Sequence, residues 1–274
     1  MKKILSIIVI ALLAGAVWFY KYNQTTILQV DLPPAQDYHN FVNNKDLIED
    51  EIVVDIIIDE EVEVEDTIVV VDPPELIVDP PELEEVLVAS INLDVPFTSQ
   101  APTANWEQPF QDACEEASFL MVDYYYQNKE LPSPLTVETS LTGMVAWQES
   151  IWGGHFNLTV EDLAEFISSN TDYNTEIVED LTIDKIKKYL NKGQPLIVPA
   201  NGKRLANPFF KNGGPEYHML VIKGYAENKI ITNDPGTSRG ADFIYTYENI
   251  LYSIADWNKK ESLATGPKRA LIVY

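Results

Sequence analysis

The sequence predicts an α+β fold for residues 91–274, and two observations carry this prediction. Segments whose apolar residues recur with helical spacing come first along this part of the chain. Five short runs rich in β-branched and aromatic residues follow, and such runs are typical of strands. Because the helices largely precede the strands instead of alternating with them, we expect an antiparallel sheet with helices gathered beside it.

The first expected helix covers residues 113–126. Its apolar residues recur at spacings of three and four and share one face; they are Ala117, Leu120, Met121 and Tyr124. Asp112 precedes the helix, where an aspartate is a favourable N-cap. The residues just after Asp112 are therefore expected in the first turn, where backbone amides lack a partner within the helix.

Three further helices are expected, at residues 159–170, 182–193 and 247–257. Thr159 and Asp162 resemble a capping box at the start of the first of these. Gly193 stands where a helix commonly ends in a left-handed residue.

The expected strands are residues 194–200, 216–226, 229–235, 242–247 and 270–274. Only Glu227 and Asn228 separate the second of these from the third. We therefore expect those two strands to be adjacent and antiparallel.

Residues 1–22 are expected to form a transmembrane anchor or a cleaved signal peptide. The apolar run 4–20 follows two lysines, and as a helix it would span about 26 Å, slightly less than a hydrocarbon core of about 30 Å. The small residues Ala14, Gly15 and Ala16 suit a signal peptidase. Both alternatives export the domain, which is then extracytoplasmic on a single-pass cell-membrane anchor, or secreted if the segment is cleaved.

Residues 23–90 are expected to form an acidic, proline-containing linker. No lysine or arginine occurs within residues 46–128, so this stretch carries most of the net charge of −24. Proline pairs and like charges favour an extended chain. Pairing of its β-prone runs and binding of cations are the alternatives for this segment. The negative charge also argues against a nucleic-acid partner.

Cys114 is the single cysteine of the chain, so it cannot form an intramolecular disulfide. It is either a small buried hydrophobic residue or a nucleophile. The first helical turn favours a nucleophile, because the helix dipole and the free amides lower the pKa of a thiol. Glu115 and Glu116 oppose this effect, but we expect both to point away and the dipole to outweigh them.

A nucleophilic thiol needs a base, and the chain has three histidines. His39 lies in the expected linker, and His155 follows two glycines in an expected loop. His218 lies in an expected strand, which would hold it rigidly. Asp234 ends the next strand and can accept a hydrogen bond from the second imidazole nitrogen. The expected strand pairing brings His218 and Asp234 side by side.

The reaction of a thiol with a carbonyl also needs donors for the oxyanion. Gln108, six residues before Cys114, can supply a side-chain amide, and the backbone amide of Cys114 is a second donor. Gln111 is an alternative to Gln108. Asn233 is an alternative to Asp234, because an amide can also orient an imidazole.

Several stretches together resemble one known family: VPFTSQAP with WEQPFQDACEEASFLM, then YHMLVIKGY, then TNDPGT. They resemble the bacteriocin-processing (double-glycine-leader) cysteine peptidase-like domains, a papain-like group. The resemblance covers roughly residues 95–260 and implies a papain-like fold. It also implies a triad of Cys114, His218 and Asp234, with Gln108 serving the oxyanion hole.

Two features depart from that family. Many members have glycine directly after the cysteine, whereas this chain has Glu115. The best-studied members are fused to an export transporter and cut leader peptides inside the cell. This sequence shows no nucleotide-binding cassette, and its domain is expected outside, so leader processing is not implied.

Three functions remain open on these grounds. The first is a membrane-tethered extracytoplasmic cysteine peptidase or amidase, acting on peptides or proteins that include those of the cell envelope. The second is an inactive peptide-binding module of the same fold, and the third is an acyl or peptidyl transferase. No cofactor is expected, and one cysteine with three scattered histidines lacks the spacing of a metal site. The domain is expected to be monomeric.

Overall fold

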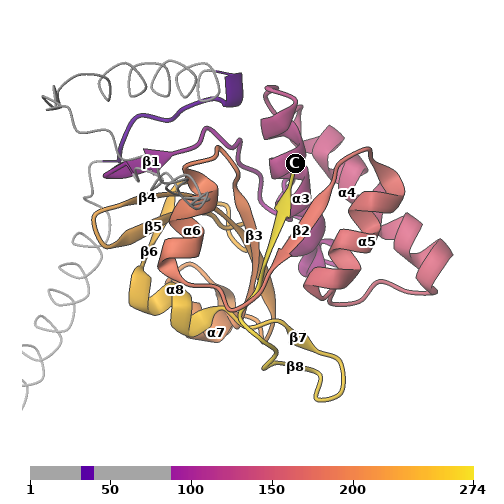
Figure 1. Cartoon of the computed structure of the whole chain (residues 1–274). Helices are drawn as coiled ribbons and strands as arrows, with labels where there is room; N and C mark the ends of the chain where they lie inside the picture. The colour runs from indigo at the N-terminus through magenta and orange to yellow at the C-terminus, as the bar shows by residue number, and fades with distance from the viewer. Residues whose placement is uncertain (1–31, 40–87) are drawn as a thin grey trace, which may run out of the picture.

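The structure, a computed structural model, describes residues 32–39 and 88–274 (Figure 1). The expected anchor or signal peptide at residues 1–22 and most of the expected linker lie outside the described residues. None of the described helices is both long and apolar enough to cross a membrane.

In the described part of the chain, a seven-stranded sheet forms the centre of the domain, and all its strand pairs are antiparallel. The strands follow the order β2-β9-β3-β4-β5-β6, and β1 pairs with β4. They are β1 Ser90–Asn92, β2 Thr175–Val178, β3 Leu196–Ala200, β4 His218–Ala226, β5 Lys229–Asn233, β6 Phe243–Thr246 and β9 Ala270–Val273. A separate pair joins β7 Trp257–Asn258 to β8 Leu263–Ala264.

The expected antiparallel sheet is confirmed, and each of the five expected strands is present as β3, β4, β5, β6 or β9. Strand β4 turns directly into β5, with Ala226 paired to Lys229 across the two intervening residues. Strands β1, β2, β7 and β8 were not predicted. They are two to four residues long, too short for an alternating pattern to stand out.

Six α-helices lie within residues 88–274: α3 Cys114–Tyr126, α4 Pro134–Trp152, α5 Val160–Asn170, α6 Ile183–Leu190, α7 Gly202–Leu205 and α8 Tyr247–Ser253. Two 3-10 turns add η1 Phe110–Asp112 and η2 Lys211–Gly213. In the view of Figure 1, α4 and α5 lie in the right half of the picture, whereas α6 and α8 lie in the left half, where β4, β5 and β6 are also labelled. The four expected helices are confirmed as α3, α5, α6 and α8. The expected capping box of α5 is complete at Thr159 and Asp162.

Helix α4 is the longest described helix, and it was not predicted. Its sequence mixes threonines, serines and a glycine with apolar residues, which blurs the helical spacing. Its ends nevertheless carry signals that sequence reasoning overlooked. Ser133 caps the first turn by accepting from the Thr136 amide, Pro134 occupies the first position, and Gly153 ends the helix at a φ of 81°.

Helix α3 begins differently from the expectation. Its N-cap is Ala113, which provides no side-chain hydrogen bond, while Asp112 belongs to the preceding turn η1. The expected cap at Asp112 is therefore wrong. The helix is buried without a break over residues 114–122, because the sheet covers it through β4 and the helices α4 and α5 cover it as well. A helix buried on nearly every side brings its first-turn side chains into the interior.

Residues 32–39, which fall in the expected linker, pack on the domain. The backbone amide of Gln36 donates to the backbone carbonyl of Asn92 over 2.8 Å, and the backbone amide of Asp94 donates to the backbone carbonyl of Gln36 over 2.7 Å. The ring of Tyr38 lies edge-on to Tyr126, with the centroids 5.2 Å apart. This short segment is thus fixed against the end of β1 and the end of α3.

Candidate active site

Cys114 is the first residue of α3 and lies beside the start of β4. It is only 5% exposed. Its thiol donates a hydrogen bond to Oε2 of Glu115, with 3.0 Å between sulfur and oxygen. The backbone of Met219, the residue after His218, also interacts with the thiol and acts to lower its pKa. The buried N-terminus of α3 therefore sets the sulfur next to the strand that begins with His218.

The surroundings raise the pKa of the Cys114 thiol well above its usual value. Burial is the main cause and the negative charge of Glu115 the next, while the Met219 backbone acts in the opposite direction. The expectation that the helix dipole outweighs the acidic neighbours is wrong. Helical side chains lean toward the N-terminus of their helix, so Glu115 reaches back to the sulfur instead of pointing away.

His218 and Asp234 meet as the sequence predicted. His218 begins β4, Asp234 follows the last residue of β5, and Nε2 of the imidazole lies 2.8 Å from Oδ1 of the carboxylate. Both residues are at most 1% exposed. The ring of Phe210 stands edge-on to the imidazole at 5.3 Å and limits its rotation. This contact at Nε2 leaves Nδ1 as the nitrogen that can exchange a proton with a nucleophile.

Asp234 is held by a set of donors. Its second oxygen, Oδ2, accepts from Asn207 Nδ2 at 3.1 Å and from the Tyr245 hydroxyl at 2.7 Å. The Gly236 amide donates to Oδ1 at 3.0 Å. Burial alone would raise the pKa of Asp234, but the charge of His218 and these hydrogen bonds together lower it below its usual value. The carboxylate is therefore ionised at neutral pH. Sequence reasoning missed Asn207 and Tyr245, because neither lies near a motif.

Neither glutamine proposed for the oxyanion contacts Cys114 in the described structure. The side chain of Gln108 is exposed, and its amide donates to Asp112 Oδ2 over 2.6 Å. Gln111 is exposed as well. The first turn of α3 carries no side-chain cap, so the backbone amide of Cys114 is not taken by one.

A third glutamine, Gln100, was not singled out from the sequence. It is 4% exposed, and its Nε2 donates to the carbonyls of Phe110 and Gln111 at 3.0 and 2.7 Å. The backbone amide of Gln100 donates to the backbone carbonyl of Pro235 over 3.0 Å. Gln100 thus ties the turn before Cys114 to the segment after Asp234. It lies in VPFTSQ, a stretch already quoted for the family resemblance, and that signal could have identified it.

A second buried acid lies beside the first. Glu116 accepts a hydrogen bond from Gln148 Nε2 of α4, and Nε2 of His155 lies 3.3 Å from its carboxylate. Burial lowers the pKa of His155, but the hydrogen bond and charge of Glu116, together with the charges of Glu115 and Asp112, raise it overall. His155 therefore pairs with Glu116, and it makes no described contact with Cys114.

The other expected alternatives have structural roles. Asn233 donates to the Val95 carbonyl at 2.8 Å and accepts from the Asp242 amide at 3.2 Å. These bonds hold its side chain away from His218. His39 is exposed next to Tyr38 in the short N-terminal segment.

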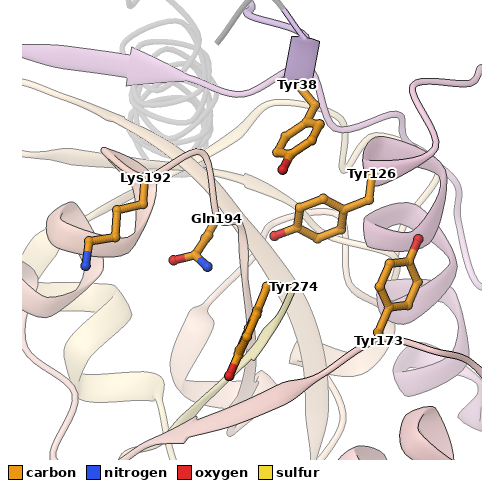
Figure 2. Close-up of a pocket in the computed structure, with 6 residues that line it drawn as sticks. All are labelled: Tyr38, Tyr126, Tyr173, Lys192, Gln194 and Tyr274. Atoms are coloured by element: carbon orange, nitrogen blue, oxygen red, sulfur yellow. The ribbon is translucent and has the colours of Figure 1, made fainter. Parts of the chain in front are cut away.

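Two of the cavities among the described residues bear on the location of the site. One, of about 320 Å³, has apolar walls that include Trp106, Leu131 and Pro134, and Ser238 from the loop after Asp234 borders it. The other, of about 290 Å³, is lined by Tyr38, Tyr126, Tyr173, Lys192, Gln194 and Tyr274 (Figure 2). Tyr126 ends α3, about 18 Å along the helix from Cys114. The tyrosine-lined cavity is therefore separate from the candidate active site.

Comparisons with known proteins give one family match and several similar solved structures. Residues 92–264 match the model of the Peptidase_C39 like family. No curated protein matches the chain. One similar solved structure comes from Bacillus anthracis and is described as a C39-like peptidase; it has 15% identity and a TM-score of 0.43 over 66% of this chain and 94% of its own.

Two further solved structures are similar. One is a double glycine motif protease from an AMS/PCAT transporter in complex with its leader peptide, with 18% identity and a TM-score of 0.35 over 58% of this chain and 82% of its own. The other is the peptidase domain of Streptococcus ComA, with 12% identity and a TM-score of 0.32 over 60% of this chain and 91% of its own.

The family match spans more than half of the chain and includes the whole cluster around Cys114, His218 and Asp234. The resemblance drawn from the motifs is thereby confirmed. The chain belongs to the Peptidase_C39 like family.

Proposed function

We propose that the chain is a cysteine peptidase or amidase that uses Cys114, His218 and Asp234 as a triad. The observation that carries this proposal is the buried 2.8 Å contact between His218 Nε2 and Asp234 Oδ1, at the start of the strand that also reaches the Cys114 thiol. A buried carboxylate that fixes one imidazole nitrogen leaves the other poised as a base. Membership of the family supports the same chemistry.

The reaction follows from these positions. Cys114 passes its proton to Nδ1 of His218, and the thiolate attacks the carbonyl carbon of a peptide or amide bond. The tetrahedral oxyanion is bound by the backbone amide of Cys114. The imidazolium then protonates the leaving amine, and water attacks the resulting thioester while His218 takes its proton. Asp234 holds the imidazole in the required tautomer throughout.

Gln108 is the proposed second donor to the oxyanion. Its amide now donates to Asp112, so this role requires the side chain to rotate when substrate binds. Because Gln108 is exposed, such a rotation meets little steric resistance.

The substrate is proposed to be a peptide, and the domain to act outside the cytoplasm on a membrane tether, as a single subunit. The first of these rests on the family, and one similar structure holds a leader peptide. The location and the tether rest on the apolar N-terminal run and its lysines. Accessibility of the domain to a protease added to intact cells checks the location.

An inactive peptide-binding module is a second candidate, and one observation favours it. The thiol donates to Glu115 and its pKa is raised, which opposes formation of a thiolate.

A transferase differs from a hydrolase only in the final acceptor. Addition of an amine to the reaction separates these two, because a transferase yields the amide product.

Alkylation of the single cysteine tests the proposal. Intact mass gives the rate between pH 4 and 10 for the purified chain and for its His218→Ala variant. A thiolate–imidazole pair makes the wild-type thiol react at a lower pH than the thiol of His218→Ala, because the imidazole accepts its proton. Equal profiles for the two proteins would reject the triad and favour the binding module.

A further inference from the structure

Glu115 is fixed at both of its carboxyl oxygens. Oε2 lies 3.0 Å from the Cys114 sulfur, and Oε1 accepts from the backbone amide of Leu158 over 3.0 Å. The residue is only 1% exposed. Leu158 is fixed in turn, because its carbonyl accepts from the Tyr217 hydroxyl over 2.6 Å. The carboxyl group therefore cannot swing away from the sulfur without breaking a buried hydrogen bond.

The charges around Glu115 are unfavourable to its ionised form. Glu116 is the next residue and is equally buried. Among the described residues, no lysine or arginine forms an ion pair with Glu115. The titratable groups that interact with its charge are Cys114 and Glu116 on α3, His155 before α5 and Tyr217 just before β4.

We propose that Glu115 is a positioning residue whose single proton decides whether Cys114 can become a thiolate. This inference rests on the proposed function. As a carboxylic acid, Glu115 donates a hydrogen bond from Oε2 to the Cys114 thiolate. As a carboxylate, it accepts the S–H bond instead and holds Cys114 in the unreactive thiol form.

Every proton is accounted for in both the protonated and the ionised state of Glu115. With protonated Glu115, the thiol proton moves to Nδ1 of His218, and the new negative charge on sulfur meets an O–H donor. With ionised Glu115, the same transfer would create a second negative charge 3.0 Å from the first in a buried site. The thiol then keeps its proton, directed at Oε2 and not at His218.

One further observation agrees with this role. Burial, with the charge of Glu116 as the next cause, raises the pKa of Glu115 to about 8, so the acid form prevails at neutral pH. Because the acid form is the one that supports the thiolate, activity is expected to fall as the pH rises through this range. A structural glutamate without a role at the sulfur would leave no such decline.

The Glu115→Gln variant tests the proposal. The Leu158 amide must face the amide oxygen of the new side chain, so its NH₂ group faces the sulfur as a permanent donor. We expect alkylation to change little at pH 7, where the acid form of Glu115 already prevails, and to quicken by about tenfold at pH 9, where the wild-type carboxyl has ionised. With a peptide substrate, the alkaline decline in kcat/KM disappears.

Two control variants are matched to it. Glu116→Gln removes an equally buried carboxylate that does not touch the sulfur, so a smaller change in alkylation is expected. Glu107→Gln removes an exposed carboxylate seven residues before Cys114, and no change is expected. An alkylation profile of folded Glu115→Gln that equals the wild-type profile would overturn the proposal.

A second measurement covers the case in which Glu115→Gln does not fold. Infrared difference spectra of the wild-type chain at pH 6.5, before and after alkylation of Cys114, should show a protonated carboxyl band that shifts when the sulfur is modified. Absence of any shifted carboxyl band would also overturn the proposal. If His218→Ala fails to alter alkylation, the triad itself fails; if His218→Ala acts and Glu115→Gln does not, only the role of Glu115 fails.

Discussion

Gly236 lies directly against the imidazole of His218. A Cβ atom built on Gly236 would come within 2.9 Å of Cε1 of His218 and within 3.2 Å of its Nε2. It would also come within 2.7 Å of Cε1 of Phe210, the ring that stands edge-on to the imidazole. The backbone at residue 236 therefore forms one wall of the slot that holds the candidate base.

The Gly236→Ala substitution should lower activity without removing any polar group. The added methyl group must displace the imidazole, since the Phe210 ring blocks the other direction. We expect kcat/KM to fall by about tenfold to a hundredfold, because small misplacements of a base are costly. Steady-state kinetics check this result. Gly143→Ala is the matched control: nothing lies within 4 Å of its Cβ, and this mid-helix change should raise stability by up to about 1 kcal/mol. Unaltered kinetics in Gly236→Ala would contradict the proposed slot.

The Asp234→Asn substitution should reduce activity far more than so small a change in the side chain suggests. An asparagine amide cannot satisfy the donors Asn207 and Tyr245 on one side and His218 on the other without placing its NH₂ group against a donor. The imidazole then loses its fixed tautomer, and kcat/KM should fall by about 10²- to 10⁴-fold. Stability should fall by about 1–3 kcal/mol, because a buried donor loses its partner. Kinetics and urea unfolding at pH 7 measure the two effects.

Asp234 also makes the free energy of unfolding depend on pH in the acid range. The folded-state pKa of Asp234 is lowered, so its contribution is present above the ordinary value near 3.8 and is lost as the pH falls through the folded-state value. Unfolding free energies at pH 3 to 6 should therefore converge for wild type and Asp234→Asn at the acid end. A gap that stays constant to pH 3 would show that the carboxylate is not the source.

Lys223 is a buried cation, and its ion pair with Asp242 allows the contribution of one charge to stability to be tested. Its ammonium, on a side chain 4% exposed, lies 2.6 Å from Asp242 Oδ1. Asp242→Asn keeps the hydrogen-bonding oxygen and tolerates the positive φ of 48° at this residue, but it removes the compensating charge. We expect a loss of about 1 kcal/mol, since Asp242 is 44% exposed. Lys223→Met should be close to neutral, because it leaves no buried charge behind. Thermal unfolding of both variants decides between a structural charge pair and incidental contact.

The sequence allowed much of the fold to be predicted, because most elements carry a local pattern. The β4–β5 hairpin is an example: two apolar runs flank a two-residue turn, and pairing between them follows from adjacency. Helix α4 escaped prediction for the opposite reason. Its apolar residues serve only a narrow stripe with Val137, Leu141 and Val145 buried, and its evidence lies in the caps rather than in the spacing.

The candidate site was predictable only where the chain itself brings residues together. His218 and Asp234 are joined by one hairpin, so their contact followed from the strand pattern. Asn207 reaches Asp234 from a loop 27 residues away, and no sequence signal announced that approach. The direction of the Glu115 side chain was also beyond sequence reasoning, since it depends on the burial of the entire first turn of α3.

Glu115 should also link the stability of the fold to pH. Its folded-state pKa is raised from an ordinary value of 4.5 to about 8, so the folded chain binds more protons than the unfolded chain between these values. The sign follows directly: this contribution to stability is complete below about pH 4.5 and is lost as the pH rises toward 8. Glu115→Gln cannot titrate, so its unfolding free energy should decline less steeply over pH 5 to 8 than that of the wild type. Urea unfolding at half-unit intervals, with Glu107→Gln as the exposed control, measures both slopes. Parallel slopes for wild type and Glu115→Gln would mean that the buried carboxyl is ionised throughout, which contradicts its role as a donor to the thiolate.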